Sequence, residues 1–336
     1  MNFLKNKSIL ITGGTGSFGS SLLNRLVSLK KNTPKKIIVF SRDELKQYEL
    51  SQEFPENDFP QLRFFLGDIR DKQRLKMAFE NVDYVIHAAA LKQVPTAEYN
   101  PIEFIKTNVI GSQNIIEAAI ETNVKKVIAL STDKASSPIN LYGATKLCAD
   151  KLFLSANTLV GKKITSFSVV RYGNVFGSRG SVIPFFLNLI KQKKQLIVTD
   201  TKMTRFNIDL DDAINLVINV INSSVGGEIF VPKISSYRIL DIVKAFQNTN
   251  KIKIIGIRPG EKIHEELISK AESYNTFDAG KYFIISGNQK SLNIYNKKKI
   301  KKFKPGHSYN SLDNSDFLTI KEIKKLIEKY IKKNHF

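Results

Sequence analysis

The stretch Ser8-Ile-Leu-Ile-Thr12, followed directly by Gly13-Gly-Thr-Gly-Ser-Phe-Gly19, decides the fold of this 336-residue chain. Its first five residues form a short apolar run that ends at glycines, which is typical of a buried strand. Gly13, Gly16 and Gly19 follow the spacing GxxGxxG, and a helical pattern of leucines begins directly behind them. Strand, glycine turn and helix in this order predict a dinucleotide-binding unit, whose backbone N–H groups approach a pyrophosphate. The alternative is a glycine-rich turn without a ligand.

The same alternation of strand and helix continues along the first half of the chain. Nearly continuous apolar strands joined by amphipathic helices are typical of a parallel sheet that is covered on both faces. The predicted fold class is therefore α/β, with a doubly wound parallel Rossmann sheet. Further strands are expected at residues 37–40, 63–66, 82–90, 126–131 and 165–171, and the longer helices at residues 101–122 and 141–158.

The regular alternation of strand and helix stops after Arg171, where several glycines mark a loop. A helix, a short strand and a helix that returns to the first layer follow, and short strands and helices alternate beyond them. This pattern predicts a smaller α/β substrate-binding domain interleaved with the first. We expect an NADP-binding domain at residues 1–175 with a return segment at about 207–225, a substrate-binding domain at 176–206 and 226–290, and a basic tail with a terminal helix, packed on the outside, at 291–336.

The composition is that of a globular protein, with 42% apolar, 25% charged and 10% aromatic residues. The single cysteine, Cys148, excludes an internal disulfide, and the four histidines never stand at metal-ligand spacing. No apolar run reaches the roughly 18–20 residues that a membrane span needs. The N-terminus enters a strand-like run at once, so no signal peptide is expected. We expect a cytoplasmic protein without a metal and without a membrane partner.

The net charge of +21 raises the question of a nucleic-acid partner. Residues 291–336 hold twelve lysines and four acidic residues, a net charge of +8, and the remaining charge is spread along the chain. No basic–aromatic motif accompanies it. A solvated lysine surface is therefore the favoured interpretation, with attraction of an anionic nucleotide substrate as the alternative. Nucleic-acid binding is not expected.

The end of the second strand bears on the choice of cofactor. It reads Phe40-Ser41-Arg42-Asp43, and a guanidinium at this place can pair with the 2′-phosphate of NADP, whereas an acidic residue would bind the ribose of NAD. NADP is favoured, and Asp43 keeps NAD open. Asp68 either accepts from the adenine amino group or caps a helix. Cofactor contacts are expected from Gly13, Gly14, Thr15, Gly16, Ser17, Phe18, Gly19, Ser41, Arg42, Asp43, Glu44, Lys46, Asp68, Ile69, Ala88, Ala89, Lys92, Tyr142 and Lys146.

The residues that follow the fifth strand carry the predicted chemistry. Ser131-Thr-Asp-Lys134 ends that strand, and Tyr142 and Lys146 stand four residues apart on the next helix, hence on one face. A lysine ammonium near a phenol favours the phenolate and lowers its pKa. Ser131 or Thr132 can hydrogen-bond a substrate hydroxyl. Such a set couples proton transfer to hydride transfer at a carbinol.

With these motifs in place, the chain resembles the extended short-chain dehydrogenase/reductase superfamily. More narrowly, it resembles the inverting UDP-N-acetylglucosamine 4,6-dehydratases of pseudaminic acid biosynthesis. The resemblance covers about residues 7–290. It rests on GGTGSFG (13–19), FSRDELKQ (40–47), GDIRD (67–71), HAAALKQVPTAEYNP (87–101), LSTDKASSPINLYGATKLCADKLF (130–153), VVRYGNVFGSRGSVIPFF (169–186), MTRFNI (203–208), GGEIFVPKI (226–234) and GIRPGEKIHE (256–265).

The resemblance implies a redox-neutral reaction on UDP-N-acetylglucosamine with bound NADP. The sugar is oxidised at C4, water is eliminated across C5 and C6, and hydride returns to C6 while C5 is reprotonated with inversion. The implied product is UDP-2-acetamido-2,6-dideoxy-β-L-arabino-hex-4-ulose. The family also implies a homo-oligomer, either a dimer or a hexamer.

Two neighbouring residues fit the elimination step. Related dehydratases that retain the C5 configuration have Glu after the Asp, and this chain has Lys134 there. Asp133 can protonate the leaving oxygen if its pKa is raised, and Lys134 can take the C5 proton if burial and a neighbouring cation depress its pKa. Tyr142 would deprotonate the 4-hydroxyl and, by the resemblance, also serve C5 reprotonation. The alternative for Asp133 and Lys134 is a loop ion pair. The expected catalytic set is Asp133, Lys134, Tyr142, Lys146 and Thr132.

The remaining motifs fit substrate binding. Arginines suit the UDP diphosphate, and a glutamate suits a ribose hydroxyl. The other readings of the chain are a retaining UDP-sugar 4,6-dehydratase, a nucleotide-sugar C4 epimerase, and a non-catalytic dinucleotide-sensing regulator. The expected substrate contacts are Lys92, Asn174, Val175, Arg179, Arg205, Arg258 and Glu261.

Overall fold

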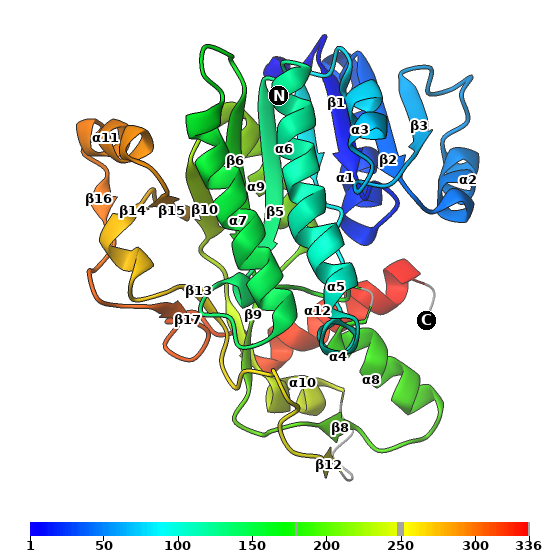
Figure 1. Ribbon diagram of the computed structural model, residues 1–336. Coiled ribbons are helices and arrows are strands. Elements are labelled where there is room, and N and C mark those ends of the chain that lie inside the picture. The colour runs from blue at the N-terminus through cyan, green and yellow to red at the C-terminus, as the bar shows by residue number, and fades with distance from the viewer. Residues whose placement is uncertain (179, 247–251, 335–336) are drawn as a thin grey trace.

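A ten-stranded mixed sheet forms the centre of the molecule in the computed structural model, which describes residues 1–178, 180–246 and 252–334 (Figure 1). The strand order is β16-β14-β15-β10-β6-β5-β4-β1-β2-β3, and the seven strands from β10 to β3 run parallel. This confirms the predicted α/β class with a doubly wound parallel sheet. The parallel strands are β1 (Ser8–Thr12), β2 (Lys36–Ser41), β3 (Leu62–Leu66), β4 (Tyr84–His87), β5 (Lys126–Thr132), β6 (Ser166–Tyr172) and β10 (Glu228–Pro232).

Both faces of the sheet are covered because successive side chains of its strands point to opposite sides. Strand β1 shows this: Leu10 packs into one apolar core, whereas Ile9 and Ile11 pack into the other, and all three are fully buried. One face is covered by α1 (Ser17–Val27), α2 (Glu44–Glu53) and α9 (Leu210–Ser223), and the other by α3 (Lys72–Phe79), α6 (Gly111–Glu121) and α7 (Leu141–Leu159).

The helix expected at residues 101–122 is interrupted. A π-helical segment, η3 (Ile105–Ile110), separates α5 (Pro101–Phe104) from α6, and α4 (Val94–Tyr99) precedes them. The wider turn accompanies the buried Asn108, whose amide accepts from the Leu91 N–H at 2.9 Å and donates to the Leu91 carbonyl at 2.9 Å. A π-bulge often marks a functional segment. Here the two hydrogen bonds of Asn108 hold the loop that follows β4.

A smaller domain lies below the sheet in the view of Figure 1, at the carboxyl ends of the parallel strands. Its own apolar core is formed by the helices α8, α10 and α12 together with short strands. The elements are α8 (Val182–Lys191), β8 (Ile197–Val198), β9 (Thr204–Ile208), β11 (Ser236–Arg238), α10 (Ile239–Ala245), β12 (Lys253–Ile254) and α12 (Ile320–Asn334), and β7 (Asn174–Val175) pairs with β9.

Two of the expected domain boundaries are wrong. Residues 226–290 were assigned to the smaller domain, yet β10, β14 (Thr276–Asp278) and β15 (Tyr282–Ser286) extend the central sheet, β15 and β14 in antiparallel order. Strand β10 is buried throughout, because it lies inside the sheet between β6 and β15. Short apolar strands look alike in sequence wherever they pair, so the pattern alone did not separate them.

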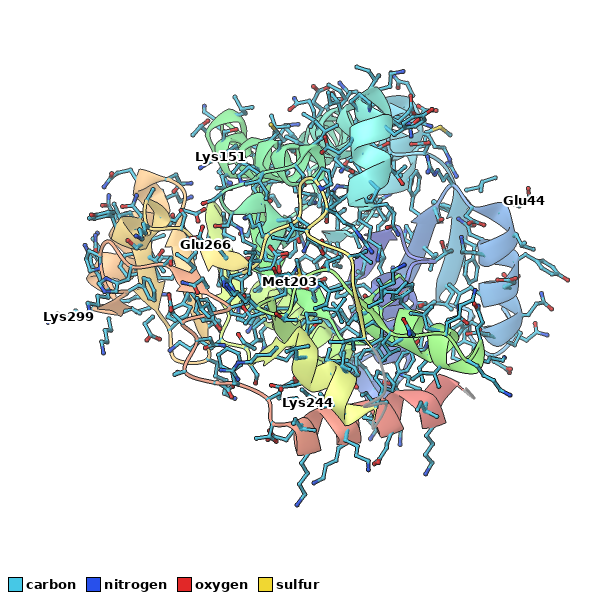
Figure 2. The ribbon with its side chains drawn as sticks, turned by 90° about the horizontal axis from the view of Figure 1, so that it is seen from below. Glu44, Lys151, Met203, Lys244, Glu266 and Lys299 are labelled. Atoms are coloured by element: carbon cyan, nitrogen blue, oxygen red, sulfur yellow. The ribbon has the colours of Figure 1, made fainter. Side chains whose placement is uncertain are left out.

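The segment 291–336 is not an outer tail. Strand β16 (Lys301–Lys302) pairs with β14, and β17 (Tyr309–Asn310) pairs with β13 (Glu266–Ile268). The apolar face of α12 is built into the core of the smaller domain, where Ile323 is fully buried. The many lysines of α12 make the segment look polar in composition, although they lie away from the apolar face of this helix. In the view from below, Glu44 and Lys299 mark opposite ends of the molecule (Figure 2).

The other short elements connect these layers. Among the described residues, no helix is long and apolar enough to cross a membrane, and no group of three or more His, Cys, Asp and Glu could hold a metal ion. The connecting elements are α11 (Gln289–Lys297) and the 3-10 helices η1 (Asn2–Leu4), η2 (Lys30–Asn32), η4 (Asp133–Ala135) and η5 (Glu272–Asn275).

Candidate active site

A cavity of about 780 Å³ opens at the carboxyl ends of β1, β2, β4, β5 and β6, and residues of both domains line it. In open α/β sheets this edge is where ligands bind. The structure brings most of the sequence-predicted residues together here, with the exception of Gly14 and Glu44, which do not line the cavity, and Arg179, which lies outside the described residues. The lining contains Gly13, Thr15, Gly16, Ser17, Phe18, Gly19, Ser41, Arg42, Asp43, Lys46, Asp68, Ile69, Ala88, Ala89, Lys92, Thr132, Asp133, Lys134, Tyr142, Lys146, Asn174, Val175, Arg205, Arg258 and Glu261.

The glycines at the start of α1 leave no room for side chains. Gly13 has a φ of +64°, and a Cβ there would lie 2.9 Å from the backbone of Ala89. A Cβ on Gly19 would lie 2.5 Å from Gly14. The chain therefore turns tightly from β1 into α1, and the first N–H groups of α1 face the cavity as a ready anion site. This geometry fits a dinucleotide pyrophosphate.

The end of β2 presents Ser41 and Arg42 to the same cavity. The hydroxyls of Ser41 and Thr15 are 2.9 Å apart, and the Arg42 guanidinium is 54% exposed, with Nη1 3.6 Å from Oδ2 of Asp68. Asp43 has a local task, because its side chain accepts from the Lys46 backbone N–H at 3.0 Å as the N-cap of α2 and also pairs with the Lys46 ammonium. The side chain of Asp43 therefore points toward the first turn of α2, where it caps the helix.

Asp68 is not the helix cap that the sequence allowed. The N-cap of α3 is Asp71, which accepts from the Arg74 N–H, whereas Asp68 binds the Arg70 guanidinium at 2.8 and 3.0 Å. Burial acts to raise the Asp68 pKa, but the hydrogen bonds and charges of Arg70 and the charge of Arg42 outweigh it and lower that pKa. The carboxylate stays charged at the cavity wall.

The 3-10 turn η4 carries the polar centre of the site. The backbone N–H of Lys134 contacts the Thr132 hydroxyl, which caps the turn and is 2.9 Å from Asp133 Oδ1. Asp133 is 1% exposed, and the Lys134 ammonium donates to its Oδ1 at 3.1 Å. Burial raises the pKa of the Asp133 carboxyl, and Lys134 only partly offsets this. The raised pKa meets the condition that the sequence analysis set for Asp133 as an acid, and the catalytic role itself stays a prediction.

The expectation of a depressed Lys134 pKa is wrong for this state of the molecule. Burial does act to lower it, and Arg205 is the neighbouring cation, but the carboxylates of Asp133 and Glu265 outweigh both and raise the pKa above its ordinary value. The Lys134 ammonium lies 3.1 Å from Oε1 of Glu265. The sequence showed Asp133 as a partner and gave no sign that a second carboxylate, 131 positions away, would join it.

Tyr142 and Lys146 lie on one face of α7, as their spacing predicted, and both line the cavity. Burial raises the Tyr142 pKa to about 12, with Lys134 opposing and Asp133 adding to the rise. The lowering by Lys146 that we expected is absent. The Lys146 ammonium donates instead to the Leu130 carbonyl at 2.7 Å, and burial lowers its own pKa.

The substrate-side residues take different positions. Arg258 and Glu261 line the wall formed by the smaller domain. Arg205 is largely committed to that wall, because it donates to the carbonyls of Ile263 and Lys262 at 2.8 and 2.9 Å and lies 3.6 Å from Glu261. The sequence predicts that Arg205 binds a diphosphate. In the structure its hydrogen bonds hold the loop 258–265 in place.

Five buried polar atoms at the cavity have no hydrogen-bond partner among the described residues. Four such atoms lie elsewhere in the described part of the chain, so more than half of these unsatisfied atoms belong to this one cavity. Buried polar groups are rarely left unpaired, which points to a polar ligand. They are Thr107 Oγ1, Asp133 Oδ2, Asn174 Oδ1, Ser181 Oγ and Glu265 Oε2.

The lining also contains polar residues that the sequence did not predict, among them Glu265, Ser181 and Lys262. Glu265 stands in the motif GIRPGEKIHE, yet only Arg258 and Glu261 were assigned from it. A carboxylate in a loop normally reads as a solvated charge. Only its burial, at 2% exposure, marks Glu265 as unusual.

A second buried network supports the floor of the site. The Ser131 hydroxyl donates to Asp150 Oδ2 at 2.8 Å, and the fully buried Arg171 guanidinium contacts Asp150 at 3.2 Å and Glu272 at 2.9 Å. Ser131 is thereby tied to α7, which leaves Thr132 as the hydroxyl beside Asp133. The network joins β5, α7, β6 and the 3-10 helix η5 in one rigid base. The site as a whole can hold a dinucleotide against β1 and present an acid, an ammonium and a phenol to a second ligand.

The comparison with known proteins gives one family and a consistent set of relatives. The matching family model is described as "Polysaccharide biosynthesis protein" and spans residues 9–287. A relative from Campylobacter jejuni, named UDP-N-acetylglucosamine 4,6-dehydratase (inverting), is 52% identical over 96% of this chain and 97% of its own length. A relative from Rickettsia canadensis, named UDP-glucose 4-epimerase, is 42% identical over 96% of this chain and 95% of its own length.

Solved structures share the whole architecture. Pen from Bacillus thuringiensis is 40% identical, with a TM-score of 0.88 over 97% of this chain and 99% of that chain. The dTDP-glucose 4,6-dehydratase DesIV from Streptomyces venezuelae, solved with NAD, has a TM-score of 0.72 over 98% of both chains. Its identity of 19% makes that second likeness one of fold alone.

Proposed function

Because this chain belongs to the polysaccharide biosynthesis protein family and resembles its inverting 4,6-dehydratases over nearly its whole length, we propose that it converts UDP-N-acetylglucosamine into UDP-2-acetamido-2,6-dideoxy-β-L-arabino-hex-4-ulose. The observation that carries this proposal is the buried pair of Asp133 and Lys134, which stands in one cavity with Tyr142. Loss of water from a sugar needs an acid at the leaving hydroxyl and a base at the neighbouring carbon. Asp133 and Lys134 offer both groups side by side.

The cofactor of the proposed reaction is NADP. The residues present fit it: the glycine turn leaves no space for a Cβ between β1 and α1, and Ser41 and Arg42 stand at the end of β2. Arg42 suits a 2′-phosphate, and Asp43, which would repel one, is occupied at the start of α2. When bound, the dinucleotide takes a hydride from C4 of the sugar and returns one to C6.

The chain's own residues would manage the protons. Tyr142, as phenolate, takes the proton of the 4-hydroxyl. The 4-ketone acidifies the C5 proton, which the amine of Lys134 removes, while the Asp133 carboxyl protonates the departing 6-hydroxyl to give water. Tyr142 then returns its proton to C5 from the opposite face, which inverts that centre. Lys146 and Thr132 orient the cofactor ribose and the sugar hydroxyl, respectively.

The experiment is an NMR time course of the purified protein with UDP-N-acetylglucosamine in deuterated water and without added reductant. We expect a 4-keto-6-deoxy product with deuterium at C5 and inverted geometry there. Retained geometry would place the chain with the retaining dehydratases. Unchanged substrate, with cofactor bound, would contradict the proposal.

The epimerase name of the relatives at about 42% identity supplies the second candidate, C4 epimerisation of a UDP-sugar. That reaction changes only C4 and needs no acid at the 6-hydroxyl. The buried pair of Asp133 and Lys134 favours dehydration, because a second acid–base pair beside Tyr142 has no task in epimerisation. In the same time course, an epimerase would yield a C4 epimer that keeps its 6-hydroxyl and takes up no deuterium at C5.

A further inference from the structure

Glu265 brings a second carboxylate to the pair of Asp133 and Lys134. It lies in the chain just before β13, and Glu266, its neighbour in sequence, is labelled in Figure 2. Its backbone is held in both directions, because the Glu265 N–H donates to the Ser311 hydroxyl at 2.9 Å and the Ser311 N–H donates to the Glu265 carbonyl at 2.8 Å. The backbone at this buried side chain is thus fixed by its pairing with the segment around Ser311.

Lys134 bridges the two carboxyl groups. Its ammonium is 3.1 Å from Oδ1 of Asp133 and 3.1 Å from Oε1 of Glu265. The other oxygen of each carboxyl, Oδ2 of Asp133 and Oε2 of Glu265, has no partner within the described ranges. The arrangement places a single amine between two carboxyl groups that line the cavity, each with one buried oxygen that has no partner among the described residues.

This arrangement conflicts with the simplest form of the elimination step. A base at C5 must be a neutral amine, yet the Glu265 carboxylate and the Oδ1 atom of Asp133, each 3.1 Å from the Lys134 Nζ atom, favour the ammonium. In addition, each turnover removes a proton from Asp133, which must be protonated again before the next sugar is processed. A mechanism must therefore explain two transfers: Lys134 has to lose a proton before elimination, and Asp133 has to regain one after it.

We propose that Glu265 accepts the proton of the Lys134 ammonium when the sugar closes the cavity, and that this proton passes to Asp133 through Lys134 after water has left. The inference rests on the proposed function. Glu265 is a positioning residue, since it acts on the substrate only through Lys134. Exclusion of water favours the step, because an ion pair in a dry site costs more than the neutral amine and carboxylic acid.

The protons balance over one cycle. An N–H bond of Lys134 breaks and an O–H bond forms on Glu265, and the amine lone pair then takes the C5 proton. The electrons of the C5–H bond form the C5–C6 double bond, and the C6–O pair leaves with the hydroxyl, which the Asp133 proton converts to water. Lys134 is then an ammonium again, Glu265 carries one extra proton and Asp133 lacks one. Transfer from Glu265 through Lys134 to Asp133 restores the starting state.

Other charged and titratable groups face this trio from the surrounding elements. The Arg205 guanidinium, on β9, has Nε 3.8 Å from Oε1 of Glu265, and it favours the carboxylate before the sugar binds. The positive charges of Arg205 and Lys262 favour the Glu265 carboxylate and therefore oppose transfer of a proton to it in the open site. The groups are Arg205 on β9, Tyr237 on β11, Tyr142 on α7 and Lys262 in the loop 258–265.

The test compares Glu265→Gln with Glu266→Gln, each supplied with cofactor and UDP-N-acetylglucosamine and followed by rapid mixing. Glu266 does not line the cavity, and the Ser136 and Ser137 hydroxyls that donate to it can donate equally to a glutamine oxygen. We expect Glu266→Gln to behave as the unaltered protein. In Glu265→Gln, oxidation at C4 continues, so the reduced-nicotinamide absorbance accumulates, while deuterium exchange at C5 slows by at least about 100-fold.

The pH profile separates this role from a merely structural one. In Glu265→Gln the amine forms only by loss of a proton to solvent, so the elimination rate rises about tenfold per pH unit below the lysine pKa. A structural defect slows oxidation and elimination equally at every pH, and that result would overturn the inference. So would elimination at the unaltered rate.

A third variant covers the case in which Glu265→Gln does not fold. Glu265→Asp keeps the buried charge and withdraws the carboxyl by one methylene, and we expect the same accumulation of reduced nicotinamide with a smaller slowing. Unaltered elimination in this variant would reject the inference. Failure of the unaltered protein to dehydrate the sugar would instead reject the proposed function.

Discussion

The ammonium of Lys134 lies 3.1 Å from Oδ1 of Asp133, although the two residues are neighbours in sequence. Neighbouring side chains usually diverge, in a strand to opposite faces. Here the chain leaves β5 and enters a 3-10 turn capped by Thr132, which aims both side chains into the cavity. Gly173 leaves space beside the acid, because a Cβ there would lie 3.4 Å from Oδ2 of Asp133.

Substitution of Lys134 tests both its chemical and its structural task. We expect Lys134→Ala to keep cofactor binding, which rests on the other side of the cavity, and to lose water elimination. It also removes the ammonium between two buried carboxyl groups and leaves Glu265 paired with the Arg205 guanidinium, so the free energy of unfolding should fall by about 3 kcal/mol. Product NMR, cofactor titration and denaturant unfolding measure the three effects.

Lys134→Arg is the matched control for the same position. Arginine keeps the positive charge between Asp133 and Glu265 but does not give up its proton near neutral pH. We expect most of the stability to return while elimination stays absent. Elimination at the unaltered rate in either variant would reject Lys134 as the base.

Arg42 is predicted to set the preference for NADP over NAD. Its guanidinium is more than half exposed at the cavity, so it can bind a 2′-phosphate with little reorganisation. We expect Arg42→Ala to weaken NADP binding by about 10- to 100-fold, which corresponds to the loss of one charge-assisted contact, and to leave NAD binding unchanged. Calorimetric titration with both dinucleotides checks this. Equal weakening for both would show that Arg42 does not read the phosphate.

His87 predicts a pH dependence of stability. Its imidazole is 2% exposed and its Nδ1 lies 2.8 Å from Oγ1 of Thr12, and burial lowers its pKa to about 3, with Lys146 adding to the effect. The unfolded chain binds a proton at about pH 6.5, whereas the folded chain does not, so stability falls as the pH drops between these values. From pH 7 to pH 5 this contributes a loss of about 2 kcal/mol.

The measurement is denaturant unfolding at both pH values, with His87→Gln as the comparison. Glutamine does not titrate, so the variant should lose about 2 kcal/mol less than the unaltered protein over this interval. An identical pH dependence in both proteins would assign the loss to other groups.

Self-association is predicted for the helical face that begins at α4. Tyr99, at the end of α4, is 88% exposed and Ile102, in α5, is 56% exposed, which is unusual for two large apolar side chains so close in the chain. Burial of this face between copies would satisfy the expected homo-oligomer. We expect light scattering to give a mass above that of one chain, and Tyr99→Glu with Ile102→Glu to reduce it. A monomer before substitution would contradict the expectation.

Much of the site could be read from local pattern. The glycine turn behind β1 and the Tyr142–Lys146 pair depend on residues close in sequence, whose geometry a strand–turn or a helix sets by itself. Domain boundaries were harder, because β10 and β15 have the apolar pattern of any buried strand and only their partners assign them to the central sheet. The prediction that residues 291–336 pack on the outside was wrong, because the overall composition of this lysine-rich segment does not reveal that one face of α12 is apolar.

By itself the sequence determined the parallel α/β architecture, because strand and helix periodicity is local, and it predicted the dinucleotide cradle and the acid, amine and phenol as candidates. The tertiary structure alone decided the burial and the charges around these groups. Glu265 reaches Lys134 from 131 positions further along the chain, and burial raises the pKa of Asp133 and of Tyr142. Protonation follows from the charges and the solvent around a group, and these depend on which distant segments the fold brings together.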